Sequence, residues 1–373
     1  MTSAPSWMPV WALPNLMVDE PVETTFVALV PVEDERVQQA AEHFVGLARF
    51  LGAFKDEFGG EIDPALIMLR DNAPERVRTV SAVASFRDAV CMSVLPLSHA
   101  RTLKRGQARD IQFSDAFDAY PWTLRDACDM HIIARTSAVL ALHDVNELQA
   151  QSAPALGARR LMRYDIDEIL LEALLSRWNT LYAGAENAEN LRLFRSLDMA
   201  RAASRMPGGT DATIFDRGRS IGMWVSAFET LAYDGGADIR RVVELLRRVP
   251  WYHRELRDPD RTLRAKKLAT NIDGDIYGRL YHLRNQFLHG DPVTSDALAL
   301  PMGREALRFA APLFRLALTA YLDLHFGELP FDAPADPAGY GPYLARFARH
   351  HGSQETIEEA VLLADKPLPN SGP

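Results

Sequence analysis

The sequence predicts an α+β protein in which a mixed α/β domain precedes an all-α antiparallel helical bundle. Three observations support this fold class. A short β-branched segment occurs near the N-terminus, apolar residues recur with almost unbroken helical spacing from Asp165 onward, and only short loops separate the helical segments. The 373 residues, 47% hydrophobic and 24% charged, are enough for two domains with ordinary cores.

The first 160 residues are expected to form the mixed α/β domain. Its expected elements are a strand over 24–32, a helix over 33–58, extended segments over 111–113 and 130–142, a turn-bearing loop over 117–122 and a linker over 149–159. Residues 1–20 are rich in Pro, Trp and Met without a clear period, and residues 77–95 mix strand and helix signals. Neither of these two segments is assigned to an element.

Residues 161–330 are expected to form the helical bundle. Helices are predicted over 165–183, 187–206, 213–232, 237–249, 265–289 and 304–326. In the third of these helices, Trp224 and Phe228 belong to the clearest apolar stripe of the chain, which predicts a core position for both. Thr213 and Asp216 have the spacing of a capping box at the start of that helix.

Two further features concern the ends of the bundle. Asp273-Gly274 is a candidate interruption of the predicted helix 265–289, and Pro312 predicts a kink in the predicted helix 304–326. Residues 331–373 are predicted to be a Pro- and Gly-rich tail with one short acidic helix over 354–363.

The charge differs between the two predicted domains. The net charge of −9 argues against a general nucleic-acid binder. Residues 191–330 nevertheless carry a small excess of Lys and Arg, whereas residues 1–190 are acidic. The C-terminal domain is therefore compatible with a polyanionic ligand.

Several protein classes are disfavoured. The chain has no apolar run of about eighteen residues, no basic region before its apolar N-terminus and no CxxC pair, since Cys91 and Cys128 are its only cysteines. Walker A, GxGxxG, HExxH and GxSxG motifs are missing as well. We expect a cytoplasmic protein with no membrane span, no cofactor and no metal site, in which the adjacent His350 and His351 are a solvated pair.

Polar residues gather near the C-terminal end of the predicted helix 265–289. On a wheel of about 100° per residue with Arg284 at zero, the apolar residues between about −40° and −100° are Ile276, Leu280, Leu283 and Phe287. The residues between 0° and about 140° are Arg284, Leu288, Tyr281, Asn285 and His289. The first set predicts a core-facing stripe, and the second predicts a polar arc turned away from the core.

This polar arc has the groups needed to cleave RNA without a metal. Gly290 is suited to end the helix and Pro292 cannot continue it, which places His289 in the last turn. A histidine can take the proton of a ribose 2′-hydroxyl or protonate the leaving 5′-oxygen. Arg284 can hold phosphate oxygens, and Asn285 can orient the imidazole or the substrate. Because one Arg and one His are few groups for this reaction, a symmetric dimer that supplies two of each is expected.

The segment Arg284-Asn285-x-x-x-His289 resembles the motif of the HEPN superfamily of nucleotide-binding proteins and ribonucleases, in which an Arg and a polar residue precede a His. The neighbouring residues 280–291 are also similar, and Trp224–Leu231 resembles the apolar helix of that family with its embedded Glu, here Glu229. The resemblance covers about residues 187–326 and is closest to the ApeA-like branch found in bacterial defence proteins. Residues 1–186 show no resemblance that we can name.

The resemblance implies that residues 161–330 form a HEPN-like domain with metal-independent endoribonuclease activity, and that Arg284 and His289 lie in a cleft at a homodimer interface. The implied function is an endoribonuclease or RNA-directed effector of a bacterial defence or toxin-like system. The alternative is an inactive HEPN-like module for dimerisation or for binding a nucleotide or another ligand. For residues 1–186 the resemblance implies only a variable sensor, regulatory or targeting domain, and a protein partner is a candidate for this N-terminal region.

Three further residues are expected to support the site. Glu229 is predicted to be a buried structural acceptor, and it could also pair with Arg284. Tyr281 lies on the same polar arc. Asp291, directly after Gly290, is expected to cap the helix or to contact the substrate.

Overall fold

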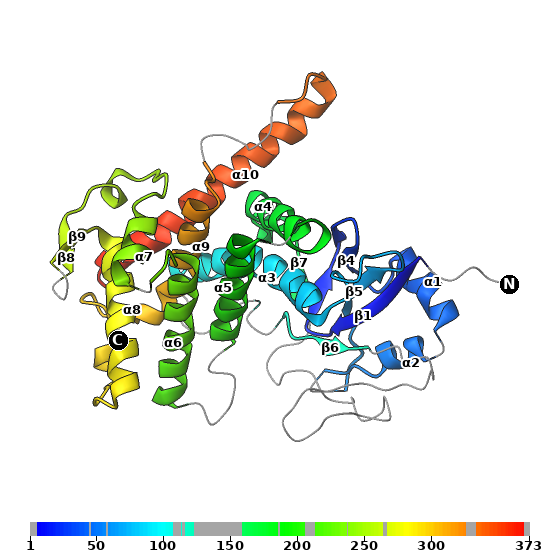
Figure 1. Cartoon of the computed structure of the whole chain (residues 1–373), viewed down its shortest axis with the longest axis horizontal. Helices are drawn as coiled ribbons and strands as arrows, with labels where there is room; N and C mark the ends of the chain where they lie inside the picture. The colour runs from blue at the N-terminus through cyan, green and yellow to red at the C-terminus, as the bar shows by residue number, and fades with distance from the viewer. Residues whose placement is uncertain are drawn as a thin grey trace. The chain divides into compact units, whose positions relative to one another are not determined.

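The computed structural model of the chain describes residues 6–44, 46–56, 59–106, 113, 116–122, 159–185, 187–205, 213–236, 238–263, 267–325 and 333–368. The chain divides into two compact units (Figure 1). The first unit contains residues up to Arg87 together with parts of 113–163 and 182–185. The second unit contains most of the helices, and it includes Asp88–Gln112, a stretch within the predicted N-terminal domain of residues 1–160.

The first unit is built on a five-stranded sheet with the order β3-β4-β5-β1-β6. Its strands are β1 (Trp7–Leu13), β3 (Val22–Glu23), β4 (Val27–Val30), β5 (Ala65–Arg70) and β6 (Tyr120–Pro121). All four strand pairings in this sheet are antiparallel. A separate parallel pair joins β2 (Leu16–Val18) to β7 (Arg159–Leu161).

Two short helices, α1 (Glu35–His43) and α2 (Leu47–Gly52), accompany this sheet (Figure 1). The Asp34 side chain caps α1 by accepting a hydrogen bond from the backbone N–H of Arg36 at 2.9 Å. The core between these helices and the sheet contains Phe50, Phe54 and Trp122. The centroid of the Phe50 ring lies 5.1 Å from that of Phe54 and 5.1 Å from that of Trp122. Aromatic burial of this kind holds together a sheet whose strands are short.

The structure confirms a strand within 24–32, where β4 lies, but in place of the single helix expected over 33–58 it has the two shorter helices α1 and α2. It corrects other expectations for this region as well. Residues 1–20, left unassigned, contain β1 and β2, and residues 77–95 belong to a helix from Val80 onward. The expected loop 117–122 contains the short strand β6. The extended segments predicted at 111–112 and 130–142 and the linker predicted at 149–158 lie outside the described residues.

Helix α3 (Val80–Lys104) is the longest apolar helix described. It is long and apolar enough to cross a membrane by composition alone, but 83% of its apolar window is buried inside the protein. It also carries the buried Asp88, which forms an ion pair with Arg201 at 2.8 Å. These are the features of a helix that lies in the core of the protein.

The second unit is a helical bundle, as predicted. Besides most of α3, its α-helices are α4 (Glu168–Trp178), α5 (Ala188–Ser204), α6 (Ile214–Leu231), α7 (Ile239–Leu246), α8 (Ile272–His289), α9 (Ala310–Tyr321) and α10 (Pro337–Leu362). Helices α5 and α6 lie side by side (Figure 1). Two buried hydroxyl groups join them, since Ser196 Oγ donates to the Ala227 carbonyl at 2.7 Å and Ser220 Oγ donates to the Ala203 carbonyl at 2.8 Å.

The core of the bundle forms around the apolar stripe of α6. Trp224 and Phe228 are buried and pack edge-on against Phe314 of α9, with ring centroids 5.6 and 5.3 Å away. Thr213 and Asp216 form the predicted capping box at the start of α6. The sequence therefore predicts both the beginning of this helix and the side that it buries.

Helix α8 begins later than predicted. The helix expected over 265–289 starts at Ile272, after a two-stranded hairpin formed by β8 (Arg261–Leu263) and β9 (Leu268–Thr270). Asp273-Gly274 therefore lies in the first turn of α8 and does not interrupt a longer helix. Pro312 likewise lies in the first turn of α9, where a missing N–H costs no helical hydrogen bond, so the predicted kink is wrong.

The short helix predicted over 354–363 is the C-terminal part of a much longer one, because α10 begins at Pro337 and packs into the bundle. Its buried side carries Gln354 and Glu358. Gln354 accepts a hydrogen bond from the fully buried Arg315, which also binds Asp167 at 2.7 Å. Glu358 accepts hydrogen bonds from Gln354 Nε2 and from the backbone N–H groups of Tyr252 and His253.

His350, expected in a solvated pair with His351, is buried on the same helix. Its Nε2 lies 3.0 Å from the His325 carbonyl oxygen. The side of α10 that packs inward is therefore partly polar, and apolar periodicity alone does not define it.

Candidate functional site

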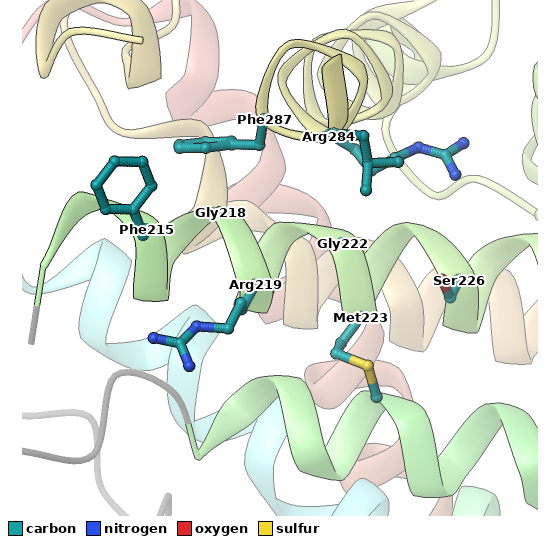
Figure 2. A pocket seen from close by; sticks show the side chains of 9 residues that line it. Phe215, Gly218, Arg219, Gly222, Met223, Ser226, Arg284 and Phe287 are labelled. Atoms are coloured by element: carbon teal, nitrogen blue, oxygen red, sulfur yellow. The ribbon is translucent and has the colours of Figure 1, made fainter. Parts of the chain in front are cut away.

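The candidate site lies where the C-terminal half of α8 packs against α6. An open, mostly apolar groove of about 610 Å³ runs between these helices (Figure 2). From α6 it is lined by Phe215, Gly218, Arg219, Gly222, Met223 and Ser226, and from α8 by Arg284, Phe287 and Leu288. Of the residues predicted from the motif, only Arg284 lines this groove.

Phe287 and Arg284 leave α8 in different directions. Figure 2 shows the Phe287 ring over Gly218 and the Arg284 side chain directed toward the part of α6 that carries Ser226. A Cβ atom at Gly218 would lie 2.6 Å from the Phe287 ring, so the close contact between the helices requires glycine there. A Cβ atom at Gly222 would meet nothing within 4 Å, which leaves this part of the groove open.

Arg284 is held by an ion pair inside the protein. Its Nη2 donates to Glu229 Oε1 at 2.9 Å, and the two side chains are only 18% and 15% exposed. Its guanidinium carbon also lies 4.8 Å from the centre of the Tyr281 ring, a cation–π contact. The expectation that Glu229 could pair with Arg284 is therefore confirmed, and Tyr281 supports the same side chain.

The helical wheel misplaced one part of the predicted polar arc. Tyr277 precedes Arg284 by seven residues and therefore shares its side of α8, yet its side chain is fully buried. This side of the helix faces α6, so Arg284 is turned toward the bundle and not away from it. The predicted core stripe is correct for Ile276, Leu280 and Leu283, which are buried.

His289 and Asn285 lie on another side of α8. His289 is exposed in the last turn, Asn285 is half-buried, and neither lines the groove. Between Arg284 and His289, Leu288 is 69% exposed. A single chain therefore does not gather the Arg, Asn and His of the motif around one cavity.

The end of α8 is as predicted. Gly290 adopts the left-handed conformation with φ 75°, and its N–H donates to the Gln286 carbonyl. The backbone N–H of Asp291 donates to the same carbonyl at 3.0 Å, so the backbone of Asp291 takes part in ending the helix. The Asp291 side chain is exposed and available to a ligand.

Sequence reasoning missed the groove residues of α6 and the buried Tyr277. Gly218, Gly222 and Ser226 recur every four residues on one side of α6, and this spacing is the signal that could have predicted a close helix contact beside an open surface. Within the described part of the chain no group of three or more His, Cys, Asp or Glu residues could hold a metal ion.

Comparison of the chain with protein-family models, with curated proteins and with solved structures finds no match. The resemblance to the HEPN superfamily therefore rests on the Arg284–His289 motif and on its helical surroundings.

Proposed function

We propose that this protein is a metal-independent endoribonuclease that acts as a symmetric dimer through its HEPN-like helical domain. The observation that carries the proposal is the combination of an arginine lining an open groove and an exposed histidine in the last turn of the same helix, Arg284 and His289. The motif that they form belongs, by resemblance, to a ribonuclease superfamily. We place the protein in the cytoplasm, as an effector of a bacterial defence or toxin-like system.

The proposed reaction transfers a phosphodiester within the RNA. The ribose 2′-oxygen attacks the adjacent phosphorus while His289 of one protomer takes the hydroxyl proton. The bond from phosphorus to the 5′-oxygen breaks, and His289 of the second protomer protonates that oxygen, which leaves a 2′,3′-cyclic phosphate and a 5′-hydroxyl. Arg284 stabilises the charge that builds on the phosphate oxygens, and Asn285 orients the imidazole or the substrate.

Dimerisation is required because one chain places Arg284 and His289 on different sides of α8. A second copy packed on the groove would bring one protomer's arginine near the other's histidine. The surface suits such a contact, because Phe215 and Leu288 are each 69% exposed beside the open space at Gly222. Both large apolar side chains would become buried from solvent at the dimer interface.

The test is RNA cleavage in the presence of EDTA. His289→Ala and Arg284→Ala are expected to lower the cleavage rate by about 100-fold or more, the range lost with a general acid–base group. His282→Ala is the matched control, since His282 is an exposed histidine on the same helix outside the motif. Cleavage that survives His289→Ala unchanged would refute the assignment.

The second candidate is a non-catalytic HEPN-like module that dimerises or binds a nucleotide, with a protein partner for residues 1–160. The observation favouring it is the Arg284–Glu229 pair, which neutralises the arginine that catalysis needs. Gly222→Leu separates the candidates, since it fills the groove without an internal clash at its Cβ atom. If the protein is a nuclease, Gly222→Leu is expected to abolish both the dimer and RNA cleavage. If it is a binding module, the substitution abolishes the dimer, and the wild-type protein already cleaves no RNA.

A further inference from the structure

We infer that Tyr277 is a positioning residue of the candidate site, whose hydroxyl donates a hydrogen bond to Glu229 when Arg284 turns from Glu229 to an oxygen of a bound phosphodiester. This inference rests on the proposed function, because it names how the arginine of that site becomes available to RNA. It concerns three side chains on two packed helices, Tyr277 and Arg284 on α8 and Glu229 on α6.

The Tyr277 hydroxyl is a donor without an acceptor. The side chain is fully buried, and its oxygen has no hydrogen-bond partner among the described residues. A buried hydroxyl without a partner is unfavourable, so such groups are uncommon in folded proteins. A phenylalanine would fill the same space without this cost, which indicates a use for the hydroxyl in another state of the site.

The ring of Tyr277 lies 6.3 Å from that of Tyr281, the ring that the Arg284 guanidinium contacts. The Tyr277 ring also lies 5.2 Å from that of Phe228, the residue before Glu229 on α6. Burial raises the pKa of Tyr277 well above its ordinary value, and the negative charge of Glu229 is the next largest cause, opposed by the positive charge of Arg284. The phenol therefore lies in the field of the same ion pair that holds the candidate arginine.

The Arg284–Glu229 ion pair has to open before Arg284 can direct its full positive charge at an anionic ligand. Glu229 has no hydrogen-bond donor other than Arg284 Nη2 among the described residues. A carboxylate that is 15% exposed and loses its only partner would carry an uncompensated charge. A hydrogen bond from Tyr277 would reduce that cost, and the phosphate would replace Glu229 as the anion beside Arg284.

A double-mutant cycle on thermal stability at pH 8 tests the exchange without any assay of activity. In the wild-type background, Tyr277→Phe removes an unpartnered hydroxyl, so the Tm is expected to stay unchanged or to rise. In the Arg284→Met background, the hydroxyl is the remaining donor to Glu229, so Tyr277→Phe is expected to lower the Tm by several degrees. The same effect of Tyr277→Phe in both backgrounds would overturn the inference.

Glu229→Gln provides the second arm and covers the case in which Arg284→Met does not fold. With Arg284 intact and the charge of Glu229 removed, Tyr277 has no anion to stabilise. Tyr277→Phe is then expected to leave unchanged the affinity for an RNA oligonucleotide made uncleavable by 2′-deoxy substitution. In the protein that retains Glu229, the same substitution is expected to weaken that affinity about tenfold. Equal effects of Tyr277→Phe in the wild-type and Glu229→Gln backgrounds would count against the inference.

Tyr321→Phe is the matched control, because it removes a tyrosine hydroxyl from the same unit but one that donates to the Glu189 carbonyl at 3.1 Å. It is expected to leave oligonucleotide affinity unchanged. If wild-type protein binds no RNA, the proposed function fails, and the stability cycle still decides the inference. If RNA is bound and cleaved but the stability cycle is additive, the inference alone fails.

Discussion

A buried carboxyl group in the first turn of α8 makes stability dependent on pH. Asp273 is fully buried, and among the described residues neither of its oxygens has a hydrogen-bond partner. Burial raises its pKa to about 7, while the nearby backbone N–H of Gly274 and the charge of Arg247 oppose that rise with smaller effects. We predict that Asp273→Asn, which keeps the shape and removes the ionisation, stabilises the protein at pH 8.

The sign follows from comparing the folded and unfolded states. Below pH 3.8 the Asp273 carboxyl is protonated in both. Between 3.8 and about 7 the unfolded chain loses the proton and the folded protein keeps it, so stability falls as the pH rises. At about 1.4 kcal/mol per pKa unit, the full penalty above pH 7 is roughly 4 kcal/mol of unfolding free energy.

A buried histidine acts in the opposite direction and has to be separated from this effect. Burial lowers the pKa of His99 to about 4, and the charge of Arg308 adds to it. The unfolded chain therefore binds more protons between about pH 4 and 6.5, and stability from this group rises with pH. The difference between Asp273→Asn and wild type cancels the contribution of His99, because both proteins contain it.

The measurement is urea unfolding of wild type and Asp273→Asn, followed by circular dichroism at pH 4.5 and pH 8. The stability advantage of the variant is expected to grow by roughly 3 kcal/mol between these pH values. Asp291→Asn, at an exposed position after the same helix, is the control and should show no comparable growth. An advantage that stays constant with pH would show that Asp273 titrates near its ordinary value, which would refute the argument.

Two further predictions concern packing and buried charge. Gly218→Ala places a Cβ atom 2.6 Å from the Phe287 ring and should lower the free energy of unfolding by about 1–3 kcal/mol. Gly222→Ala places its Cβ atom in open space within a helix and should raise the free energy of unfolding by up to about 1 kcal/mol. Equal effects of the two substitutions in urea unfolding would contradict the contact between Gly218 and Phe287. Arg315→Met leaves the buried Asp167 carboxylate without its cation and should lower the free energy of unfolding by about 3–5 kcal/mol. Adding Asp167→Asn should restore part of that stability, and a further loss of stability would argue against an unpaired carboxylate as the cause.

The sequence predicted the parts of the fold that depend on apolar periodicity. Trp224 and Phe228 repeat at helical spacing, and both lie in the core of the bundle. Only the C-terminal part of α10 was predicted, because Pro342 and three glycines in the rest of the helix are typical of a loop. Strand β1 was missed for a different reason, since it is defined by pairing with β5, far along the chain, and not by a local pattern.

The candidate site was predictable along one helix but not between two helices. Gly290 and the position of His289 follow from local rules for helix ends, and the structure agrees with them. The orientation of Arg284 depends on α6, because Glu229 and the packing of Tyr277 turn that side of α8 inward. A helical wheel treats a helix in isolation, so it cannot distinguish a polar residue facing water from one facing a buried carboxylate.

Whether the Arg284–Glu229 ion pair can open therefore distinguishes the two proposed functions. An arginine that remains bound to Glu229 presents little net charge to a ligand, and the apolar groove beside it then suits a protein surface better than a phosphate. An arginine that can leave Glu229 presents a full positive charge at the edge of the same groove. Because Tyr277 is the buried donor in the field of that carboxylate, its hydroxyl bears on which of these states is accessible. The free energy needed to open the Arg284–Glu229 ion pair is therefore a more direct test of catalysis against binding than the presence of the motif.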